Sequence, residues 1–358
     1  MTRPPAIFDV MAALPLAVEA AEAEAIARER WGIAATAEPL PGERDRNFHL
    51  KASDGREYVL KFANPAEDAG FRAMQIAALR HIAATDPNLA VPRLVPLRDG
   101  TIETPVLQAG VPHATGLIQY ARLLTWVGGT QIAHGTPSPA QRAAYGATVA
   151  RLQNALATFD HPARGNEMAW DLQHAPKLRD IAFTLPLQAA RDVLLDLLDH
   201  HDRHVVPEFA TLPRQIVHND LNRMNVLVNP ADHSSIAGII DFGDIAHTAT
   251  IFDLAIAAVQ LPGGDAPLRE CLAQFLRGYQ TLRPLLPIEV ALFPQLMATR
   301  YALGLTLASW HRHTQPDNPH FDLSEPAIRR RLATIAEFRT PGLSAFLARA
   351  CGLEEGIK

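Results

Sequence analysis

The sequence predicts an α+β fold in two lobes, a smaller N-terminal lobe built on an antiparallel sheet and a larger, mostly helical C-terminal lobe. The chain has 358 residues, which exceeds the roughly 250–300 at which a single hydrophobic core usually stops growing. Apolar and polar residues alternate around a hairpin turn near the N-terminus. Most of the remaining sequence repeats apolar residues at helical spacing.

The composition is that of an ordinary globular protein, with 48% hydrophobic and 20% charged residues. The net charge of -5 and the lack of a basic run disfavour a nucleic-acid partner, so a small and possibly cationic molecule fits better. Two cysteines, Cys271 and Cys351, are too few for a disulfide framework. No segment approaches the ~18 consecutive apolar residues of a membrane span. We therefore expect a cytoplasmic protein without a membrane partner.

The N-terminal segment is predicted to be a helical extension. Residues 16–31 are rich in Ala and Glu and are followed by Gly32, a frequent stop signal for helices. We therefore assign residues 1–33 to a peripheral extension that precedes the first lobe.

The first lobe is predicted to contain a hairpin followed by a helix. Phe48 and Leu50 alternate with polar neighbours, Asp54-Gly55 supplies a two-residue turn, and residues 58–62 form the second strand. Residues 65–84 then repeat apolar side chains at helical spacing. The lobe therefore combines an antiparallel sheet with one helix.

The boundary between the lobes is placed at a pair of glycines. A strand-like segment over residues 117–125 runs into Gly128-Gly129. We therefore assign residues 34–127 to a nucleotide-binding lobe with its hinge, and residues 128–358 to a catalytic and substrate-binding lobe.

Helices are predicted through most of the second lobe. Ser138 followed by Pro139 opens the first of them. The others are expected near residues 187–204, 251–260, 267–282, 288–313 and 326–338. A single polar segment with short strands, residues 215–244, interrupts this pattern.

This polar segment contains the residue types that phosphoryl transfer requires. His218, Asp220 and Asn225 lie in a loop between two apolar strands, and Asp241 ends a further strand. The reaction needs a hydroxyl placed in line and cations that neutralise the phosphates. Because Mg²⁺ prefers oxygen ligands, we interpret Asn225 and Asp241 as metal ligands. Asp220 can accept or orient the proton of the incoming hydroxyl.

The pattern H-x-D-x-x-x-x-N, followed by a strand and D-F-G, resembles the catalytic and metal loops of the protein-kinase-like superfamily. Its His-x-Asp form with a helical second lobe looks like the aminoglycoside phosphotransferase and choline kinase branch. The resemblance implies a bilobal kinase-like fold, Mg²⁺, ATP or GTP as co-substrate, and catalytic roles for Asp220 and His218. Asp253 falls where the family has an acidic residue, which we interpret as steadying the catalytic loop.

The first lobe supplies further residues that the resemblance requires. The loop that begins at Gly42 lies where the family has its phosphate loop, so Gly42 and Asn47 are predicted nucleotide contacts. Lys61 resembles the strand lysine that holds the α- and β-phosphates. Leu124 and Trp126 lie in the hinge segment, where the nucleotide base is expected.

Two features depart from the family pattern, and the first is that the phosphate loop has Gly42 as its only glycine. The helix after the strand lysine usually carries a glutamate that orients it, whereas the best-aligned position here is Gln75. An amide can accept a hydrogen bond from the ammonium of Lys61 with less charge assistance. Glu67 or Asp68 could serve instead, so all three remain alternatives.

Within the branch, residues 122–126, residues 170–172 and the two loops look like the hydroxylysine kinase subfamily. This resemblance implies 5-hydroxylysine as the acceptor. Homoserine, choline and aminoglycosides are alternatives, as is a catalytically inactive nucleotide-binding module. An amine-bearing acceptor would be attracted to carboxylates and to an aromatic face, so Asp244, Trp170 and Asp171 are the predicted substrate residues.

Overall fold

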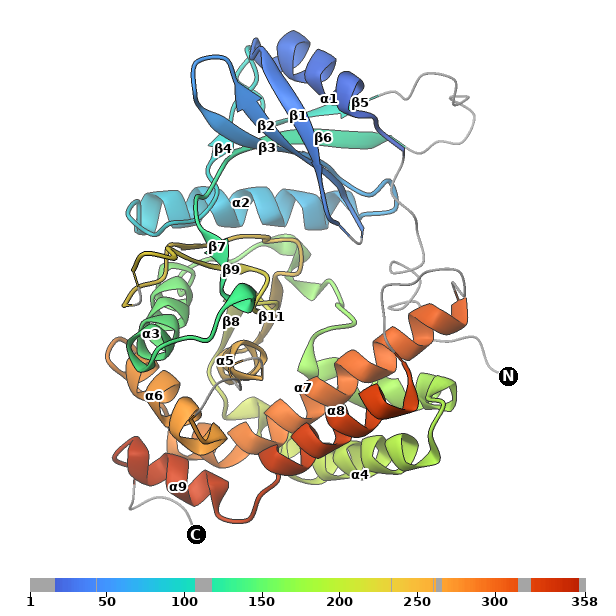
Figure 1. Ribbon diagram of the computed structural model, residues 1–358, viewed down its shortest axis with the longest axis vertical. Helices are drawn as coiled ribbons and strands as arrows, with labels where there is room; N and C mark the ends of the chain where they lie inside the picture. The colour runs from blue at the N-terminus through green and yellow to red at the C-terminus, as the bar shows by residue number, and fades with distance from the viewer. Residues whose placement is uncertain are drawn as a thin grey trace. The chain divides into compact units, whose positions relative to one another are not determined.

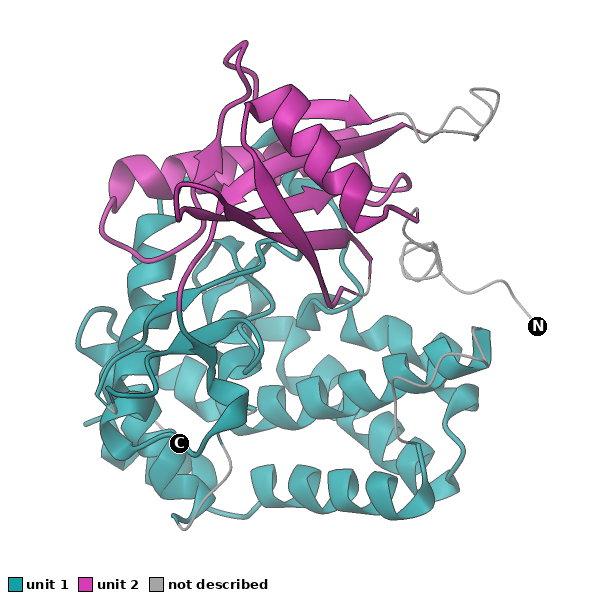
Figure 2. Cartoon of the chain, turned by 45° about the horizontal axis from the view of Figure 1, so that its top comes forward, with its two compact units in different colours: residues 1–8, 129–358 teal, residues 9–128 magenta. Residues whose placement is uncertain are grey.

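The computed structural model describes residues 17–42, 44–106, 118–232, 234–259, 261, 266–314 and 323–353. The chain divides into two compact units, an N-terminal unit that ends at Gly128 and a C-terminal unit that begins at Gly129 (Figure 2). The first is built on an antiparallel sheet and the second is mostly helical (Figure 1), so the predicted α+β class is confirmed. No helix within the described ranges combines the length and apolar character that a membrane crossing requires.

The N-terminal unit contains a six-stranded antiparallel sheet, in the order β1-β2-β3-β6-β4 with β5 also paired to β6. Its strands are β1 (Ala35–Leu40), β2 (Arg46–Ala52), β3 (Glu57–Phe62), β4 (Leu94–Val95), β5 (Glu103–Val106) and β6 (Gln119–Thr125). Gly55 adopts a φ of 84° in the turn between β2 and β3. This left-handed conformation suits glycine, and it closes the predicted hairpin.

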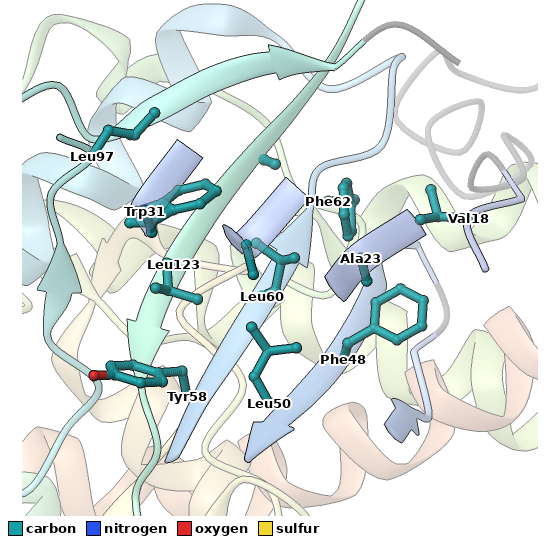
Figure 3. Packing of buried hydrophobic residues seen from close by; sticks show 12 residues of the cluster. Val18, Ala23, Trp31, Phe48, Leu50, Tyr58, Leu60, Phe62, Leu97 and Leu123 are labelled. Carbon is teal, nitrogen blue, oxygen red and sulfur yellow. The ribbon is translucent and has the colours of Figure 1, made fainter. Parts of the chain in front are cut away.

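One face of this sheet carries the apolar cluster drawn in Figure 3. Phe48 on β2 and Leu60 on β3 are fully buried in it. Helix α1 (Ala20–Ile26) packs against the same cluster, and Trp31, just after this helix, donates a hydrogen bond from its indole to the Val95 carbonyl at 3.0 Å. Burying one such apolar side chain stabilises the fold by about 1.5–3 kcal/mol. The predicted N-terminal helix is thus an integral part of the sheet's core.

The opposite face of the sheet carries polar residues. The strand register places Asn47 opposite Lys61, and Lys61 opposite Arg122. Val59, two residues before Lys61 on β3, pairs with Leu124 on β6. Because directly paired residues point to the same face and side chains alternate along a strand, Asn47, Lys61 and Leu124 share this face.

Helix α2 (Ala69–Thr85) lies on the side of the sheet away from α1 in Figure 1. It begins at Asp68, whose carboxylate accepts a hydrogen bond from the Phe71 backbone N–H at 2.8 Å. An aspartate in this position satisfies one of the N–H groups that lack a partner in the first turn of a helix. This cap explains why the helix starts later than the sequence predicted.

The C-terminal unit is formed mainly by helices. They are α3 (Pro139–Ala155), α4 (Gln188–His204), α5 (Thr250–Ala258), α6 (Leu268–Gln280), α7 (Pro287–Thr314), α8 (Glu325–Phe338) and α9 (Leu343–Ala350). The helices predicted from residue 187 onward are confirmed, with ends that differ by at most two residues. Helix α9 and the 3₁₀ segment Leu172–Thr184 were not predicted.

Helices α3 and α6 approach closely because each has glycine at the contact. A Cβ atom on Gly146 would lie 1.9 Å from the Phe275 carbonyl oxygen, and one on Gly278 would lie 1.9 Å from the Ala143 carbonyl oxygen. Neither position therefore has room for a side chain, and the two backbones pack directly against each other.

Two small sheets support the polar segment of this unit. Strands β7 (Thr130–Gln131), β9 (Val226–Val228) and β10 (Gly238–Ile239) form one, and β8 (Arg214–Val217) pairs with β11 (Ala246–Ala249) in the other. Two short connections link the sheets, from β8 to β9 and from β10 to β11. These two connections contain the predicted catalytic and metal-binding residues.

Candidate active site

The loop between β8 and β9 fixes the carboxylate of Asp220. Its Oδ2 atom accepts hydrogen bonds from the side-chain amides of Asn222 at 2.8 Å and Asn225 at 2.9 Å. Its Oδ1 atom lies 3.4 Å from Nη2 of Arg300 on α7. The side chain is 17% exposed. Both oxygens are therefore oriented by the protein, while part of the carboxylate remains accessible.

Asn225 is oriented with its oxygen available. Its Nδ2 group donates to the backbone carbonyl and to the carboxylate of Asp220, both at 2.9 Å. No described residue donates a hydrogen bond to its Oδ1 atom. An amide oxygen held in this way is suited to bind a hard cation.

Asp241 follows β10 in a left-handed backbone conformation, with a φ of 62°. Asn219 in the other loop has a φ of 64°. Such values are uncommon for residues other than glycine, and Asn and Asp tolerate them best. The Asp241 Oδ1 atom accepts a hydrogen bond from the Gly243 N–H at 3.2 Å. The strained residue is thus the predicted metal ligand itself in one loop, and it lies beside His218 and Asp220 in the other.

His218 connects the two loops through their backbones. Its Nε2–H donates to the Ile240 carbonyl at 3.0 Å, and its Nδ1 accepts from the Asp220 N–H at 3.3 Å. These bonds require a neutral ring, and burial lowers the pKa of His218 accordingly. Both ring nitrogens of His218, for which the sequence predicted a catalytic role, therefore bind within the protein.

Asp253 on α5 holds the same loop, as the sequence predicted. It is fully buried, and its Oδ1 atom accepts from the Asn219 N–H at 2.7 Å. Its Oδ2 atom accepts from the Gln153 amide at 3.0 Å. The carboxylate therefore stabilises the loop at its strained residue.

The loops concentrate negative charge. Burial and the charges of Asp244 and Asp241 raise the pKa of Asp220 to about 8, against the opposing effects of Arg300 and the Asn222 amide. A divalent cation bound at Asn225 and Asp241 would favour the ionised form of Asp220. The described ranges contain no cluster of three or more His, Cys, Asp or Glu side chains that could hold a metal alone. A cation would therefore depend on the amide oxygen and on substrate phosphates as additional ligands, which is usual for Mg²⁺.

The predicted substrate residues Asp171 and Trp170 contact groups of the protein itself. Asp171 is fully buried and accepts hydrogen bonds from the Gln173 N–H at 3.0 Å and the Thr248 hydroxyl at 2.8 Å. It therefore caps the 3₁₀ segment Leu172–Thr184, and this placement argues against a contact with substrate. Trp170 has the guanidinium of Arg300 over its ring, 5.0 Å from the centroid. The aromatic face predicted for a cationic substrate thus holds an arginine of the protein.

Arg300 was missed by the sequence analysis, although it contacts Asp220 directly. It is 8% exposed and interacts electrostatically with Asp220 and Asp244. No motif marks it, since it lies in a long helix 80 residues from Asp220 in the chain.

In the N-terminal unit, Lys61 pairs with Asp45. The ammonium nitrogen lies 2.6 Å from the carboxylate oxygen, and both side chains are buried. The charge of Lys61 lowers the pKa of Asp45 against the effect of burial. Asp45 was also missed, although it lies two residues before Asn47, the strand partner of Lys61.

The three alternatives for orienting Lys61 are used differently. Gln75 donates to Glu67 at 2.8 Å and accepts a hydrogen bond from Arg122. Asp68 caps α2. Glu67 interacts electrostatically with Lys61. The direct ion pair of Lys61 is with Asp45, a residue outside these three alternatives.

Of the remaining predicted nucleotide contacts, Gly42 and Asn47 lie near this pair. A Cβ atom on Gly42 would be 2.5 Å from the Asp45 carbonyl oxygen, so only glycine permits this loop conformation. Asn47 has a buried Oδ1 atom without a hydrogen-bond partner among the described residues. Trp126 stacks on His49, which shares the face of Lys61, with ring centroids 3.9 Å apart.

Comparison with known proteins identifies the family. Residues 36–288 match the model of the phosphotransferase enzyme family (APH). The chain is 25% identical over 303 residues to hydroxylysine kinase of Danio rerio, covering 83% of this chain and 85% of the relative. It is 27% identical over 299 residues to homoserine kinase of Ralstonia nicotianae, covering 76% and 78%.

A solved microcompartment-associated aminopropanol kinase has the same fold, with a TM-score of 0.68 and 20% identity over 90% of this chain and 98% of that one. The predicted kinase-like fold is thus confirmed. The chain belongs to the phosphotransferase enzyme family and is a small-molecule kinase.

Proposed function

We propose that the protein transfers the γ-phosphate of ATP or GTP to the hydroxyl of an amino-acid acceptor, with 5-hydroxylysine as the first candidate. The arrangement around Asp220 carries this proposal. Its carboxylate is fixed by two amides of its own loop and stays partly exposed, beside an Asn225 oxygen that has no described donor. Such a group can receive or orient the proton of an attacking hydroxyl.

Asn225 and Asp241 would hold Mg²⁺ in this reaction. The metal, when bound, would bridge the phosphates and neutralise charge that develops on them. His218 would position Asp220 through its bonds to both loops.

The N-terminal residues would handle the nucleotide. Lys61 would bind the phosphates, held by Asp45 at 2.6 Å. Gly42 and Asn47 would contact the phosphates, while Leu124 and Trp126 would contact the base. On this proposal, residues 34–127 bind the nucleotide and residues 128–358 carry catalysis and the acceptor site.

The similarity to hydroxylysine kinase over most of both chains supports 5-hydroxylysine as the acceptor. Homoserine is the second candidate because a homoserine kinase is also similar over most of its length. Both acceptors are amino acids with a side-chain hydroxyl. Choline and aminoglycosides are the alternative acceptors, and a nucleotide-binding module without activity is the alternative function. The assay distinguishes these alternatives.

An acceptor panel tests the proposal. Purified protein with Mg²⁺ and either ATP or GTP is incubated with 5-hydroxylysine, homoserine, choline, aminopropanol and an aminoglycoside. Release of nucleoside diphosphate and the mass of the product are then measured. We expect phosphorylation of an amino acid, with 5-hydroxylysine giving the highest kcat/KM. Phosphorylation of only choline or aminoglycosides would contradict the proposed acceptor, and no acceptor-dependent release would contradict the proposed reaction.

A further inference from the structure

Arg300 occupies an unusual position for a structural arginine. Its guanidinium lies over the ring of Trp170, with Cζ 5.0 Å from the centroid. Nη2 of the same group lies 3.4 Å from the Asp220 carboxylate. A guanidinium held against an aromatic face keeps its plane fixed. It is thus preorganised directly beside the proposed base.

The contacts within the protein do not satisfy this guanidinium. The Arg300 side chain is 10% exposed, and its Nε–H has no hydrogen-bond partner among the described residues. Its contact with Asp220 is longer than the ~2.7–2.9 Å typical of a charge-assisted hydrogen bond. A buried donor without a partner costs about 1–3 kcal/mol, which an accepting group of a bound ligand would offset.

We propose that the Nε edge of Arg300 binds a carboxylate of the acceptor and makes the enzyme selective for hydroxylated amino acids. The inference rests on the proposed function, in which the acceptor hydroxyl lies at Asp220. Arginine is suited to this task because its planar fork matches the two oxygens of a carboxylate.

The neighbouring charges complete a site for a zwitterion. Asp244 is buried and interacts electrostatically with both Asp220 and Arg300. It would attract the ammonium of the acceptor while Arg300 binds the carboxylate. Trp170 acts through Arg300, since its ring positions the guanidinium.

This contact would allow the enzyme to discriminate between amino acids and amino alcohols as acceptors. An amino alcohol can use Asp220 and Asp244 but does not form the hydrogen bond to the Nε–H of Arg300. Because a hydrogen bond to a charged group contributes about 1.5–3 kcal/mol, the preference for the carboxylate-bearing acceptor should be about 10- to 100-fold.

A different role for Arg300 would be to balance the charge of Asp220 without touching the acceptor. Its loss would then affect every acceptor alike, whereas a carboxylate contact affects only acceptors that carry a carboxylate. The ratio of activities on matched acceptors separates these two roles.

The experiment uses acceptor pairs that differ only in the carboxylate. These are 5-hydroxylysine with 1,5-diaminopentan-2-ol, and homoserine with 3-aminopropan-1-ol. For each compound, kcat/KM is measured with both nucleotides, and the Kd is measured by calorimetry in their absence. The proteins are the wild type, Arg300→Gln, Arg300→Lys and Arg142→Gln. Arg142 is a matched control because it is also buried with an unpartnered Nε and binds the neutral Gln274 at 2.9 Å.

We expect the wild type and Arg142→Gln to prefer the carboxylate-bearing member by about 10- to 100-fold, and Arg300→Gln to lose most of this preference. Arg300→Lys keeps the positive charge near Asp220 but lacks the fork, so it provides the same test if Arg300→Gln fails to fold. An equal loss on both members of a pair, or a wild type without preference in kcat/KM and Kd, overturns the inference. Arg300-dependent binding of the carboxylate without phosphorylation supports the inference and contradicts the proposed function. Phosphorylation of 5-hydroxylysine without a preference for the carboxylate-bearing member contradicts the inference and supports the proposed function.

Discussion

Replacement of Asp220 by Asn tests the proposed base most directly. The variant keeps the size of the side chain, but one oxygen becomes an NH₂ group. Asn222 and Asn225 both donate to Oδ2, while Arg300 approaches Oδ1. Because every neighbour is a donor, the new NH₂ group must face a donor in either orientation. The more favourable orientation leaves the amide oxygen with the two asparagines and sets the NH₂ group against Arg300.

The expected effects follow from this geometry. Loss of a general base lowers kcat by about 10²–10⁴-fold. The buried guanidinium of Arg300 loses its carboxylate, which should lower the free energy of unfolding by about 1–3 kcal/mol. Nucleotide affinity should change little, because the proposed phosphate contact, Lys61, is paired with Asp45 in the N-terminal unit.

The assay compares wild type, Asp220→Asn and Asp232→Asn. Asp232 is a suitable control because it lies in the same polar segment and accepts a hydrogen bond from the Ser234 N–H at 2.8 Å. Single-turnover rates, nucleotide Kd and urea unfolding are measured for each protein. A folded Asp220→Asn protein that retains a tenth or more of the wild-type rate would refute the assignment of Asp220 as base. A change in nucleotide Kd alone would indicate that Asp220 acts in nucleotide binding.

Three further predictions concern nucleotide binding and stability. Asp45→Asn should raise the KM for ATP or GTP by about 10-fold, since one partner of a buried ion pair is lost; an unchanged KM in steady-state assays would argue against this positioning role. Gly146→Ala should destabilise the protein by at least about 2 kcal/mol in urea unfolding, because its Cβ would lie 1.9 Å from a backbone oxygen, whereas Gly165→Ala has open space and serves as control. Burial lowers the pKa of His201 to about 4 from 6.5. Its contribution to the free energy of unfolding is present above pH 6.5 and is lost as the pH falls toward 4. Between pH 7 and 4.5 the wild type should therefore lose about 2 kcal/mol more than His201→Leu. Equal losses in the variant and the wild type would contradict the last prediction.

Much of the fold could be predicted because its signals are local. Apolar residues at helical spacing gave the ends of helices α4 to α8 within two residues. The start of α2 was predicted too early because Asp68 forms a cap at the N-terminus, and the sequence contains several acidic residues that could have done so. The 3₁₀ segment Leu172–Thr184 escaped prediction, and its buried cap, Asp171, was interpreted as a substrate residue because the sequence does not show that this carboxylate is buried.

The sequence by itself determined the reaction class and the residues in the two loops, because the spacing of His218, Asp220, Asn225 and Asp241 is set by neighbours along the chain. Their functional roles remain predictions.

Only the tertiary structure decided what surrounds these residues. It brought Arg300 to Asp220 across 80 residues, paired Asp45 with Lys61 and buried Asp171 away from solvent. Each of these contacts depends on how a helix or strand packs against a distant loop. Long-range packing leaves no periodicity in the sequence, so the candidate acceptor-binding arginine became apparent only in the folded protein.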